Sequence, residues 1–566
     1  HDSLDIEFAI TKDDLVHIMQ IRPIAVADRE QSIDDENISL AINEATEFFN
    51  NLQKSSPFLV GNSTILSNMS DWNPAEIIGA KPNRLAFSLY RYLISDEVWA
   101  IQRAENGFRD VRPHNLIVDI LGHPYVDLRV CFNSFIPDNL SDDLAERLAN
   151  YYLEYLSQNP ALHDKVEFEV ILTCLSFDFD QRIRKLSRSV FTEEDIEYIR
   201  SGLLEITKST LLRNESDMTT ILKMEERYEL IINSELAPLE RAYQLIEEIR
   251  RFGTPAFSHL ARCAFIAFSF LKSLMKTQCI SQKQFDDFLS TLNTVPSKMK
   301  SDAYKVRTKK LSWEDFVRKY GHLRPSSYDI TSLCYANAPE DYLRPLIYES
   351  VLESSKNKTV WGKETCRAIG KMLGKHQIDL DPNRLEELLR AAIERREFSK
   401  FIFTKNLNAS LESICEFGSK YGITREELAS VRVKDLFQLR SANCENIGNL
   451  LKRLSEIGEE EFKLTQGITL PGQIVSEDDF VCIEQFKSEP NFITQKQIIA
   501  KVFPLDRHIA PEIDLSGKIV GLGGKPNIDK KNPTEIIKEL TKQLDVLTVG
   551  SILQDKTKNI ISDIEV

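Results

Sequence analysis

The stretch that decides the predicted fold is Leu4-Asp-Ile-Glu-Phe-Ala-Ile10, followed after five residues by Val16-His-Ile-Met-Gln-Ile-Arg-Pro-Ile24. Both segments are short and apolar, and a polar connection separates them. The pattern predicts an antiparallel β-hairpin at the start of the sequence.

The predicted hairpin carries four polar side chains at alternating positions. Asp5 and Glu7 share one face of the first strand, and Gln20 and Arg22 share one face of the second. Two carboxylates, an amide and a guanidinium on paired strands can hold a divalent metal together with a polyphosphate. An amphipathic edge hairpin with a solvated polar face is the alternative interpretation.

The composition is that of a large globular protein. The chain has 566 residues, of which 42% are apolar, and this length suits about three or four domains. A net charge of −15, from 86 acidic and 71 basic residues, argues against a general surface for nucleic acid or anionic membranes. No apolar run approaches the roughly 18 residues needed to span a bilayer. We therefore expect neither a nucleic-acid nor a membrane partner.

The nine cysteines are dispersed singly, without a Cys-x-x-Cys pair or zinc-type spacing to histidine. An odd, scattered set is typical of reduced thiols in the core of a cytoplasmic protein. The sequence therefore favours a cytoplasmic location.

Arginines concentrate in a region that lacks a helical surface pattern, where Arg103, Arg109, Arg112 and Arg129 occur. Alternation of polar and apolar residues predicts one strand over Pro124–Pro137 and a second, long strand over Val166–Phe179. Arginines on strands and in glycine turns are well placed for bidentate binding of carboxylate or phosphate. Structural pairing with aspartate is the alternative.

Three longer segments have helical periodicity, with apolar residues at three- and four-residue spacing. They are Ala25–Ser56, Thr192–Pro296 and Ala338–Glu461. Within the second, Arg251–Pro255 predicts a break between two helices, and within the third, Leu380–Arg384 predicts a helix start. These segments make the predicted structure predominantly helical.

Two further segments combine polar side chains with helix-boundary residues. Asn73 and Pro74 predict a cap and the first turn of a helix. Gly321 predicts a helix end that leaves His322 and Arg324 on an irregular loop. Clustered polar groups on a constrained loop are candidate site residues. For the histidine, capping of the helix end is the alternative.

Short apolar runs return towards the C-terminal end of the sequence. They predict strands over Ile468–Ile474, Pro490–Lys496 and Ile513–Val520. A lysine-rich segment with helical character follows to Val566.

The first hairpin resembles the last hairpin of the ATP-grasp domain in the phosphoenolpyruvate synthase and pyruvate phosphate dikinase superfamily. There, an acidic strand of the Asp-Ile-Glu-Phe type precedes a Gln-x-Arg strand, and Asp5, Glu7, Gln20 and Arg22 fall on this pattern. The resemblance implies that these four residues contact ATP and that Asp5 and Glu7 bind Mg²⁺. It also implies that most of the nucleotide-binding domain precedes the given sequence.

The central region resembles the branch of this superfamily that is related to L-glutamine kinase of capsule phosphoramidate synthesis. The segments that carry the likeness are Asp71-Trp-Asn-Pro74, Arg109-Asp-Val-Arg-Pro113, Phe132-Asn-Ser-Phe-Ile-Pro137 and Gly321-His-Leu-Arg-Pro325. By resemblance, a small-molecule phosphate acceptor is bound by Arg109, Arg112, Arg129, His322 and Arg324. The amide of L-glutamine is one candidate acceptor.

The region from residue 466 resembles the start of the swivelling phosphohistidine domain of the same superfamily. In complete members, a strand like Gly517–Val520 leads to a Gly-Gly-x-x-Ser-His turn whose histidine carries phosphate. Here Gly521-Leu-Gly-Gly-Lys-Pro-Asn527 follows the strand without a histidine, and His508 precedes it. No catalytic carrier histidine is therefore assigned.

Together these features predict a multidomain α+β protein with four parts. They are a remnant of the ATP-grasp domain (1–30), a large mixed α/β acceptor-binding domain that is mostly helical (31–465), an incomplete phosphohistidine domain (466–524) and a helical tail (525–566). Because both ends depart from the family pattern, we expect an incomplete enzyme or one completed by a partner chain.

The implied reaction is ATP-dependent phosphotransfer through a phosphohistidine, in which ATP, an acceptor and water give AMP, the phosphorylated acceptor and phosphate. Two alternatives stay open. One is an enzyme of the phosphoenolpyruvate synthase type that acts on pyruvate, and the other is a non-catalytic acceptor-binding protein.

Overall fold

The computed structural model describes residues 3–10, 16–24, 35–184, 190–350, 361–441, 446–481, 501–505 and 518–522. By their contacts, the residues divide into two units, His1–Glu30 with Lys487–Val566, and Gln31–Phe486. The domain boundaries expected from the sequence, at residues 30, 465 and 524, stay predictions. The strand β6 (Gln473–Ile474) belongs to the second of these contact units.

The first unit contains the predicted hairpin. Strands β1 (Ser3–Ile10) and β2 (Val16–Ile24) pair antiparallel, which confirms this prediction. The register places the acidic residues of one strand opposite the polar residues of the other, Asp5 opposite Arg22 and Glu7 opposite Gln20.

The same unit contains a parallel pair, β7 (Lys501–Leu505) and β8 (Lys518–Leu522). The end of the strand predicted over Ile513–Val520 is thus confirmed. The strand predicted over Pro490–Lys496, His508 and the tail from residue 525 lie outside the described residues.

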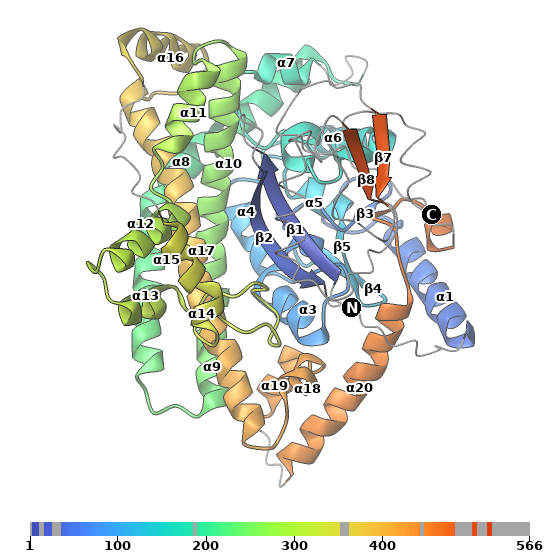
Figure 1. Cartoon of the computed structure of the whole chain (residues 1–566). Helices are drawn as coiled ribbons and strands as arrows, with labels where there is room; N and C mark the ends of the chain where they lie inside the picture. The colour runs from blue at the N-terminus through green and yellow to red at the C-terminus, as the bar shows by residue number, and fades with distance from the viewer. Residues whose placement is uncertain are drawn as a thin grey trace. The chain divides into compact units, whose positions relative to one another are not determined.

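The second unit is built on three long helical rods that lie side by side (Figure 1). Two of them are α8 (Glu193–Ile232) and α17 (Pro382–Ser419). The third runs from α9 (Pro238–Glu248) through the π-helical turn η4 (Ile249–Gly253) into α10 (Thr254–Lys276). Helix α8, with 40 residues, is about 60 Å long.

The break predicted at Arg251–Pro255 is a π-helical turn rather than an interruption. Pro255 directly follows this turn and lacks the backbone N–H that a regular helix would use at this position. The helix start predicted near Pro382 is confirmed, because the Asp381 side chain accepts hydrogen bonds from the backbone N–H groups of Asn383 and Arg384.

The other helices and helical turns of this unit are shorter than the rods. They are α1 (Asp35–Leu52), α2 (Pro74–Ile77), α3 (Arg84–Tyr90), η1 (Arg91–Ser95), α4 (Val98–Glu105), α5 (Leu128–Asn133), α6 (Asp142–Gln158), η2 (Pro160–Leu162), η3 (Val166–Val170), α7 (Phe179–Ile183), α11 (Gln282–Ser290), α12 (Val295–Arg307), α13 (Trp313–Tyr320), α14 (Pro339–Tyr342), α15 (Arg344–Glu349), α16 (Lys363–Lys375), α18 (Arg425–Ala429), α19 (Val433–Gln438), α20 (Ile447–Gly467) and η5 (Glu477–Phe480). None of the described helices combines the length and apolar character that a membrane crossing requires.

A small antiparallel sheet joins distant parts of the unit. Its strands follow the order β4 (Ile117–Ile120), β5 (His123–Asp127), β3 (Leu66–Ser67) and β6 (Gln473–Ile474). Helix α1 packs beside this sheet, where Phe49 meets Phe480 with ring centroids 5.9 Å apart.

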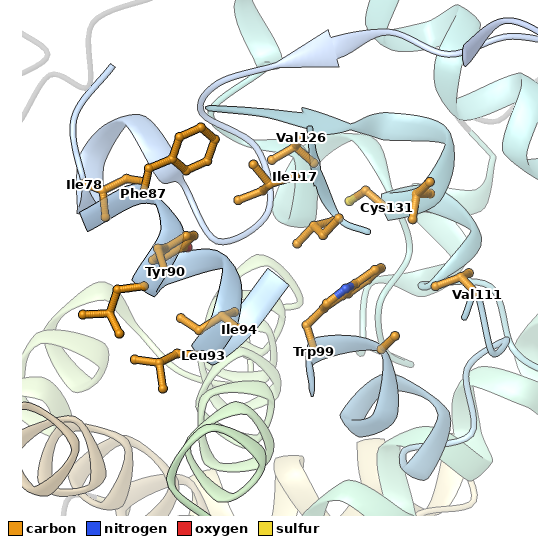
Figure 2. Close-up of a cluster of buried hydrophobic side chains, with 14 of the residues drawn as sticks. Ile78, Phe87, Tyr90, Leu93, Ile94, Trp99, Val111, Ile117, Val126 and Cys131 are labelled. Carbon is orange, nitrogen blue, oxygen red and sulfur yellow. The ribbon is translucent and has the colours of Figure 1, made fainter. Parts of the chain in front are cut away.

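The largest core cluster connects the sheet to the helical segment α3–η1–α4. In Figure 2, Tyr90, Ile94 and Trp99 from this segment lie in one buried cluster with Ile117 and Val126 from the sheet. These side chains are at most 2% exposed. The backbone of α4 is therefore held in a rigid position, which matters for the polar residues that it carries.

The strand predicted over Pro124–Pro137 is wrong beyond Asp127. There the chain turns into α5, because Asp127 Oδ1 accepts hydrogen bonds from the backbone N–H of Val130 at 3.1 Å and from Thr64 Oγ1 at 2.6 Å. Every residue of β5 and α5 is buried, so the alternation of residue types did not mark an inner and an outer face.

The strand predicted over Val166–Phe179 is also wrong. Its first residues form the π-helical turn η3, the middle is irregular, and its last residue begins α7. The two glutamates of η3 are thereby not on one solvated strand face. One of them, Glu167, becomes part of the site described next.

Candidate functional site

The candidate site begins with a buried ion pair between Asp71 and Arg103. Asp71 lies in the loop between β3 and α2, and Arg103 lies in the last turn of α4. Arg103 Nη2 donates to Asp71 Oδ2 at 2.7 Å, and each side chain is 3% exposed. Charges taken so far out of water need close partners, because their desolvation costs several kcal/mol each.

A second buried pair lies nearby, between Arg262 of α10 and Glu167 of η3. Arg262 Nη1 donates to Glu167 Oε2 at 2.7 Å, with side chains 4% and 13% exposed. The ring of Phe135 connects the two pairs, since its centroid lies 3.8 Å from Arg103 Cζ and 4.7 Å from Arg262 Cζ. We refer to Asp71, Arg103, Glu167 and Arg262 as the buried charge cluster.

The pKa values of the two carboxyl groups in this cluster are shifted in opposite directions. Burial raises the pKa of Asp71 to about 6, and the negative charge of Glu167 also raises it, against the effect of Arg103. For Glu167, burial also raises the pKa, but Arg262 and Arg103 outweigh burial and hold the pKa below its ordinary value. A carboxyl pair with separated pKa values is the arrangement that general acid–base chemistry uses.

One face of α4 carries buried polar groups beside this cluster. The residues on this face, which we call the polar face of α4, are Trp99, Gln102, Arg103 and Asn106. Within the described part of the chain, several of their polar atoms have no hydrogen-bond partner: Trp99 Nε1, Gln102 Nε2, Arg103 Nε and Nη1, and Asn106 Oδ1 and Nδ2.

Arg262 adds another such atom, its Nε, from the neighbouring helix α10. Nearly all buried polar atoms in native proteins are paired with protein or water. Apart from Asn106 Oδ1, the unpartnered atoms are N–H donors. A buried water or a small group rich in acceptors, such as a carboxylate or a phosphate, would satisfy these donors.

The loop that presents Asp71 has a strained backbone. Trp72 and Asn73 have positive φ angles of 59° and 30°, which are uncommon for residues other than glycine. The loop is fixed by Tyr90 Oη, which donates to the carbonyl oxygen of Trp72 at 2.6 Å. Such strain persists only where surrounding contacts impose it, and it is concentrated at functional sites. Pro74 begins α2 as predicted, but Asn73 makes no side-chain capping hydrogen bond.

The predicted acceptor residues Arg109 and Arg112 lie between α4 and β4 and have their own partners. Arg109 Nη2 donates to Asp142 Oδ1 at 2.6 Å. Arg112 Nε donates to both carboxylate oxygens of Asp110, at 2.8 and 3.0 Å. Both contacts match the alternative interpretation of these arginines, in which they form structural ion pairs with aspartates.

Arg129 is a buried residue of α5 rather than a strand residue. Its guanidinium donates to the carbonyl oxygens of Leu52 and Lys54, at 2.8 and 2.9 Å. These carbonyls lie at the C-terminal end of α1, where a regular helix leaves them without partners and where positive charge is favourable. Arg129 thus anchors the end of α1.

The predicted loop residues His322 and Arg324 follow α13, which ends at Tyr320 with Gly321 as its cap. The His322 ring lies against Phe401, with centroids 4.4 Å apart. Burial lowers the pKa of His322 to about 4. Arg324 reaches α17, where its Nη2 donates to Glu412 Oε1 at 2.7 Å and to Asn408 Oδ1 at 2.7 Å.

The structure therefore gives the five predicted acceptor residues separate sets of partners. Their part in acceptor binding stays a prediction, as does nucleotide binding by Asp5, Glu7, Gln20 and Arg22, whose side chains are not described. Across the described residues, no group of three or more histidine, cysteine, aspartate or glutamate side chains is placed to hold a metal ion. Mg²⁺ binding by Asp5 and Glu7 is likewise a prediction.

Sequence reasoning noticed part of the buried charge cluster but missed the rest. Asp71 stood in a quoted motif and Arg103 stood among the concentrated arginines. Glu167 was hidden by the wrong strand prediction, and Arg262 was not singled out within the helical segment Thr192–Pro296. A charged residue inside the otherwise apolar run of α10 was the available indication that this position is buried and paired.

Comparison with models of known protein families gives no match to this chain.

Proposed function

We propose that this chain supplies the acceptor-binding part of an ATP-dependent phosphotransferase of the phosphoenolpyruvate synthase type, and that the buried charge cluster binds the acceptor. The observation that carries the proposal is the excess of unpartnered N–H donors on the polar face of α4 and on Arg262. A bound carboxylate would accept hydrogen bonds from these donors and would lie beside two guanidinium groups.

The acceptor that suits this arrangement best is an amino acid with an amide side chain, such as L-glutamine. Its carboxylate complements Arg103 and Arg262, and its ammonium and amide N–H groups complement the carboxylates of Asp71 and Glu167. Pyruvate would use the arginines but would leave both carboxylates without a new partner. This difference supports an amino acid over pyruvate as the acceptor.

The carboxyl pair then has a defined role. Glu167, whose pKa is held low, is ionised at neutral pH and can accept the proton that the acceptor nitrogen loses as its bond to phosphorus forms. The bond that breaks joins phosphorus to the nitrogen of the carrier histidine, which the family resemblance implies. ATP and Mg²⁺, bound elsewhere, would supply the phosphoryl group to that carrier.

The first test is calorimetric titration of the chain with L-glutamine and, separately, with pyruvate. We expect L-glutamine to bind with a dissociation constant of about 1 mM or tighter. Gln102→Met, which removes an unpartnered donor without changing side-chain length, should weaken binding about tenfold. The matched control is Gln158→Met at the exposed end of α6 and should bind like the original protein.

Three results would count against the proposal. They are no binding of L-glutamine, equal binding by the Gln102→Met variant, and preferential binding of pyruvate. Binding of L-glutamine without phosphoryl transfer, even with ATP, Mg²⁺ and a carrier domain from a related enzyme, would support the non-catalytic alternative.

A further inference from the structure

A second polar site, open to solvent, lies beside α3. The segment α3–η1, the β4–β5 turn, the residue before α19 and the last turns of α20 enclose a cavity of about 340 Å³. This volume lies in the range of small-ligand pockets. The lining shares no residue with the buried charge cluster, so the two sites are chemically independent.

Three arginines line this cavity, and we call it the arginine pocket. Arg84 and Arg91 come from the α3–η1 segment, and Arg432 precedes α19. Each has one carboxylate partner: Arg84 with Glu461 at 2.6 Å, Arg91 with Asp96 at 2.9 Å, and Arg432 with Asp435 at 3.2 Å.

These pairs fix the arginines without consuming their hydrogen-bonding capacity. Each of these ion pairs uses a single nitrogen of the guanidinium, whereas a guanidinium has five N–H donors. Asp96 and Asp435 do not line the cavity. Their ion pairs with Arg91 and Arg432 therefore fix these side chains without occupying the cavity. The guanidinium groups therefore retain donors for a ligand in the cavity.

The pocket lining carries three guanidinium groups and two carboxylates, those of Asp119 and Glu461. Because Asp96 and Asp435 also pair with Arg91 and Arg432 from outside the lining, the arginines would hold a ligand through their remaining N–H donors rather than through excess positive charge. Asp119 Oδ1 accepts a hydrogen bond from the backbone N–H of Gly122 at 2.7 Å, which fixes its position. Burial raises the pKa of Asp119, against the effect of the nearby arginines. Its remaining oxygen can accept a hydrogen bond from a ligand hydroxyl.

Helix α20 forms its wall of the pocket by unusually close backbone packing. A Cβ atom at Gly458 would lie 2.0 Å from the carbonyl oxygen of Ser430, just before Arg432. A Cβ atom at Gly122 would lie 2.0 Å from Thr465 Oγ1, and Gly122 has a φ angle of +81°. Two glycines thus allow α20 to approach both neighbouring walls, with Glu461 between these contacts.

We propose that the arginine pocket binds a small phosphate monoester that also carries hydroxyl groups. The phosphate binds to Arg84, Arg91 and Arg432, because a dianion with three acceptor oxygens matches several guanidinium groups at once. A hydroxyl group of the ligand donates to Asp119. This inference does not depend on the acceptor or reaction proposed for the buried charge cluster.

The test is calorimetric titration of the full chain with glycerol 3-phosphate, inorganic phosphate and glycerol. Glycerol 3-phosphate should bind with a dissociation constant of about 1 mM or tighter, inorganic phosphate more weakly, and glycerol not measurably. Binding should weaken as salt is added, since the contacts are ionic.

Two pocket variants and one control make the test specific. Arg91→Gln and Arg432→Gln should each weaken binding of glycerol 3-phosphate at least about tenfold. Arg384→Gln is the matched control for Arg432, because Arg384 is 56% exposed with an i,i+3 partner and Arg432 is 57% exposed with an i,i+3 partner. This control should bind unchanged.

The proposal is overturned if none of the phosphates binds, or if both pocket variants bind as tightly as the control. A phosphate monoester also occurs as the headgroup of phosphatidic acid. Sedimentation with phosphatidylcholine vesicles that contain phosphatidic acid separates the two sources: variant-sensitive binding to vesicles assigns a lipid headgroup, and its absence with retained glycerol 3-phosphate binding assigns a free metabolite.

Discussion

Arg103 and Arg262 approach the same aromatic ring from two different helices. The guanidinium carbons lie 3.8 and 4.7 Å from the ring centroid of Phe135, and each guanidinium is paired with its own carboxylate at 2.7 Å. The aromatic ring attracts both guanidinium groups. The two carboxylates offset the repulsion between the two guanidinium groups. Removing one member should therefore affect the whole cluster.

The first prediction concerns the buried ion pair. Arg103→Gln leaves Asp71 buried without its cation and should lower the free energy of unfolding by about 3–5 kcal/mol at pH 7. Urea denaturation followed by circular dichroism measures this change. Arg109→Gln breaks a pair whose aspartate is 83% exposed and should cost at most about 1 kcal/mol. Similar losses in the two variants would contradict the assigned burial of the cluster.

The second prediction separates partnered from unpartnered buried amides. Gln102→Met should leave the free energy of unfolding unchanged within about 1 kcal/mol, because Gln102 Nε2 donates to no described residue. Asn133→Leu should destabilise the protein by about 2–4 kcal/mol, because Asn133 exchanges hydrogen bonds with both the N–H and the carbonyl of Val60. Equal destabilisation would show that Gln102 has a partner after all.

The third prediction is a pH dependence of stability that comes from His322. Its pKa is about 4 in the folded protein, against an ordinary value of about 6.5 when unfolded. Between these values the unfolded chain binds the extra proton, so stability falls as the pH is lowered from about 6.5 to 4.

The His322→Gln variant isolates this effect. Across that pH interval, the original protein should lose up to about 3 kcal/mol more stability than the variant. Denaturant titrations of both proteins at pH 7 and pH 4.5 provide the measurement. Parallel losses in the two proteins would mean that His322 ionises freely in the folded state.

The fourth prediction compares two helical glycines. Gly458→Ala should destabilise the protein by about 1–3 kcal/mol, because the new Cβ atom meets the carbonyl oxygen of Ser430. Gly374→Ala in α16 meets no atom within 4 Å and should stabilise by about 0.5–1 kcal/mol. Thermal unfolding of the two variants should thus shift in opposite directions. A stabilising Gly458→Ala change would refute the close packing of α20.

Helix periodicity and boundary residues predicted many of the helices of the second unit. The apolar spacing over Thr192–Pro296 corresponds to real buried stripes, and Asp381 with Pro382 marked the start of α17. These features depend on local geometry, which a single sequence records directly. The predominantly helical fold could be predicted for this reason.

The candidate site could be predicted only in part, because its geometry depends on contacts between distant segments. Asp127 lies in a stretch of alternating polar and apolar residues that is typical of a strand. Only its hydrogen bonds with Thr64 and Val130 show that a helix begins there. Glu167 and Arg262 are separated along the chain, and neither has a neighbour in sequence that indicates the other. Ion pairs of this kind are invisible to periodicity.

The π-helical turn η4 has a consequence for insertions and deletions. A π-turn adds one residue to an α-helix and shifts everything after it by about 100° around the helix axis. Deletion of one residue from Ile249–Gly253 would restore a regular helix, yet it would rotate α10 and move Arg262 away from Phe135 and Glu167. The number of residues in this turn, rather than the chemistry of any one of its side chains, sets the direction in which Arg262 leaves α10.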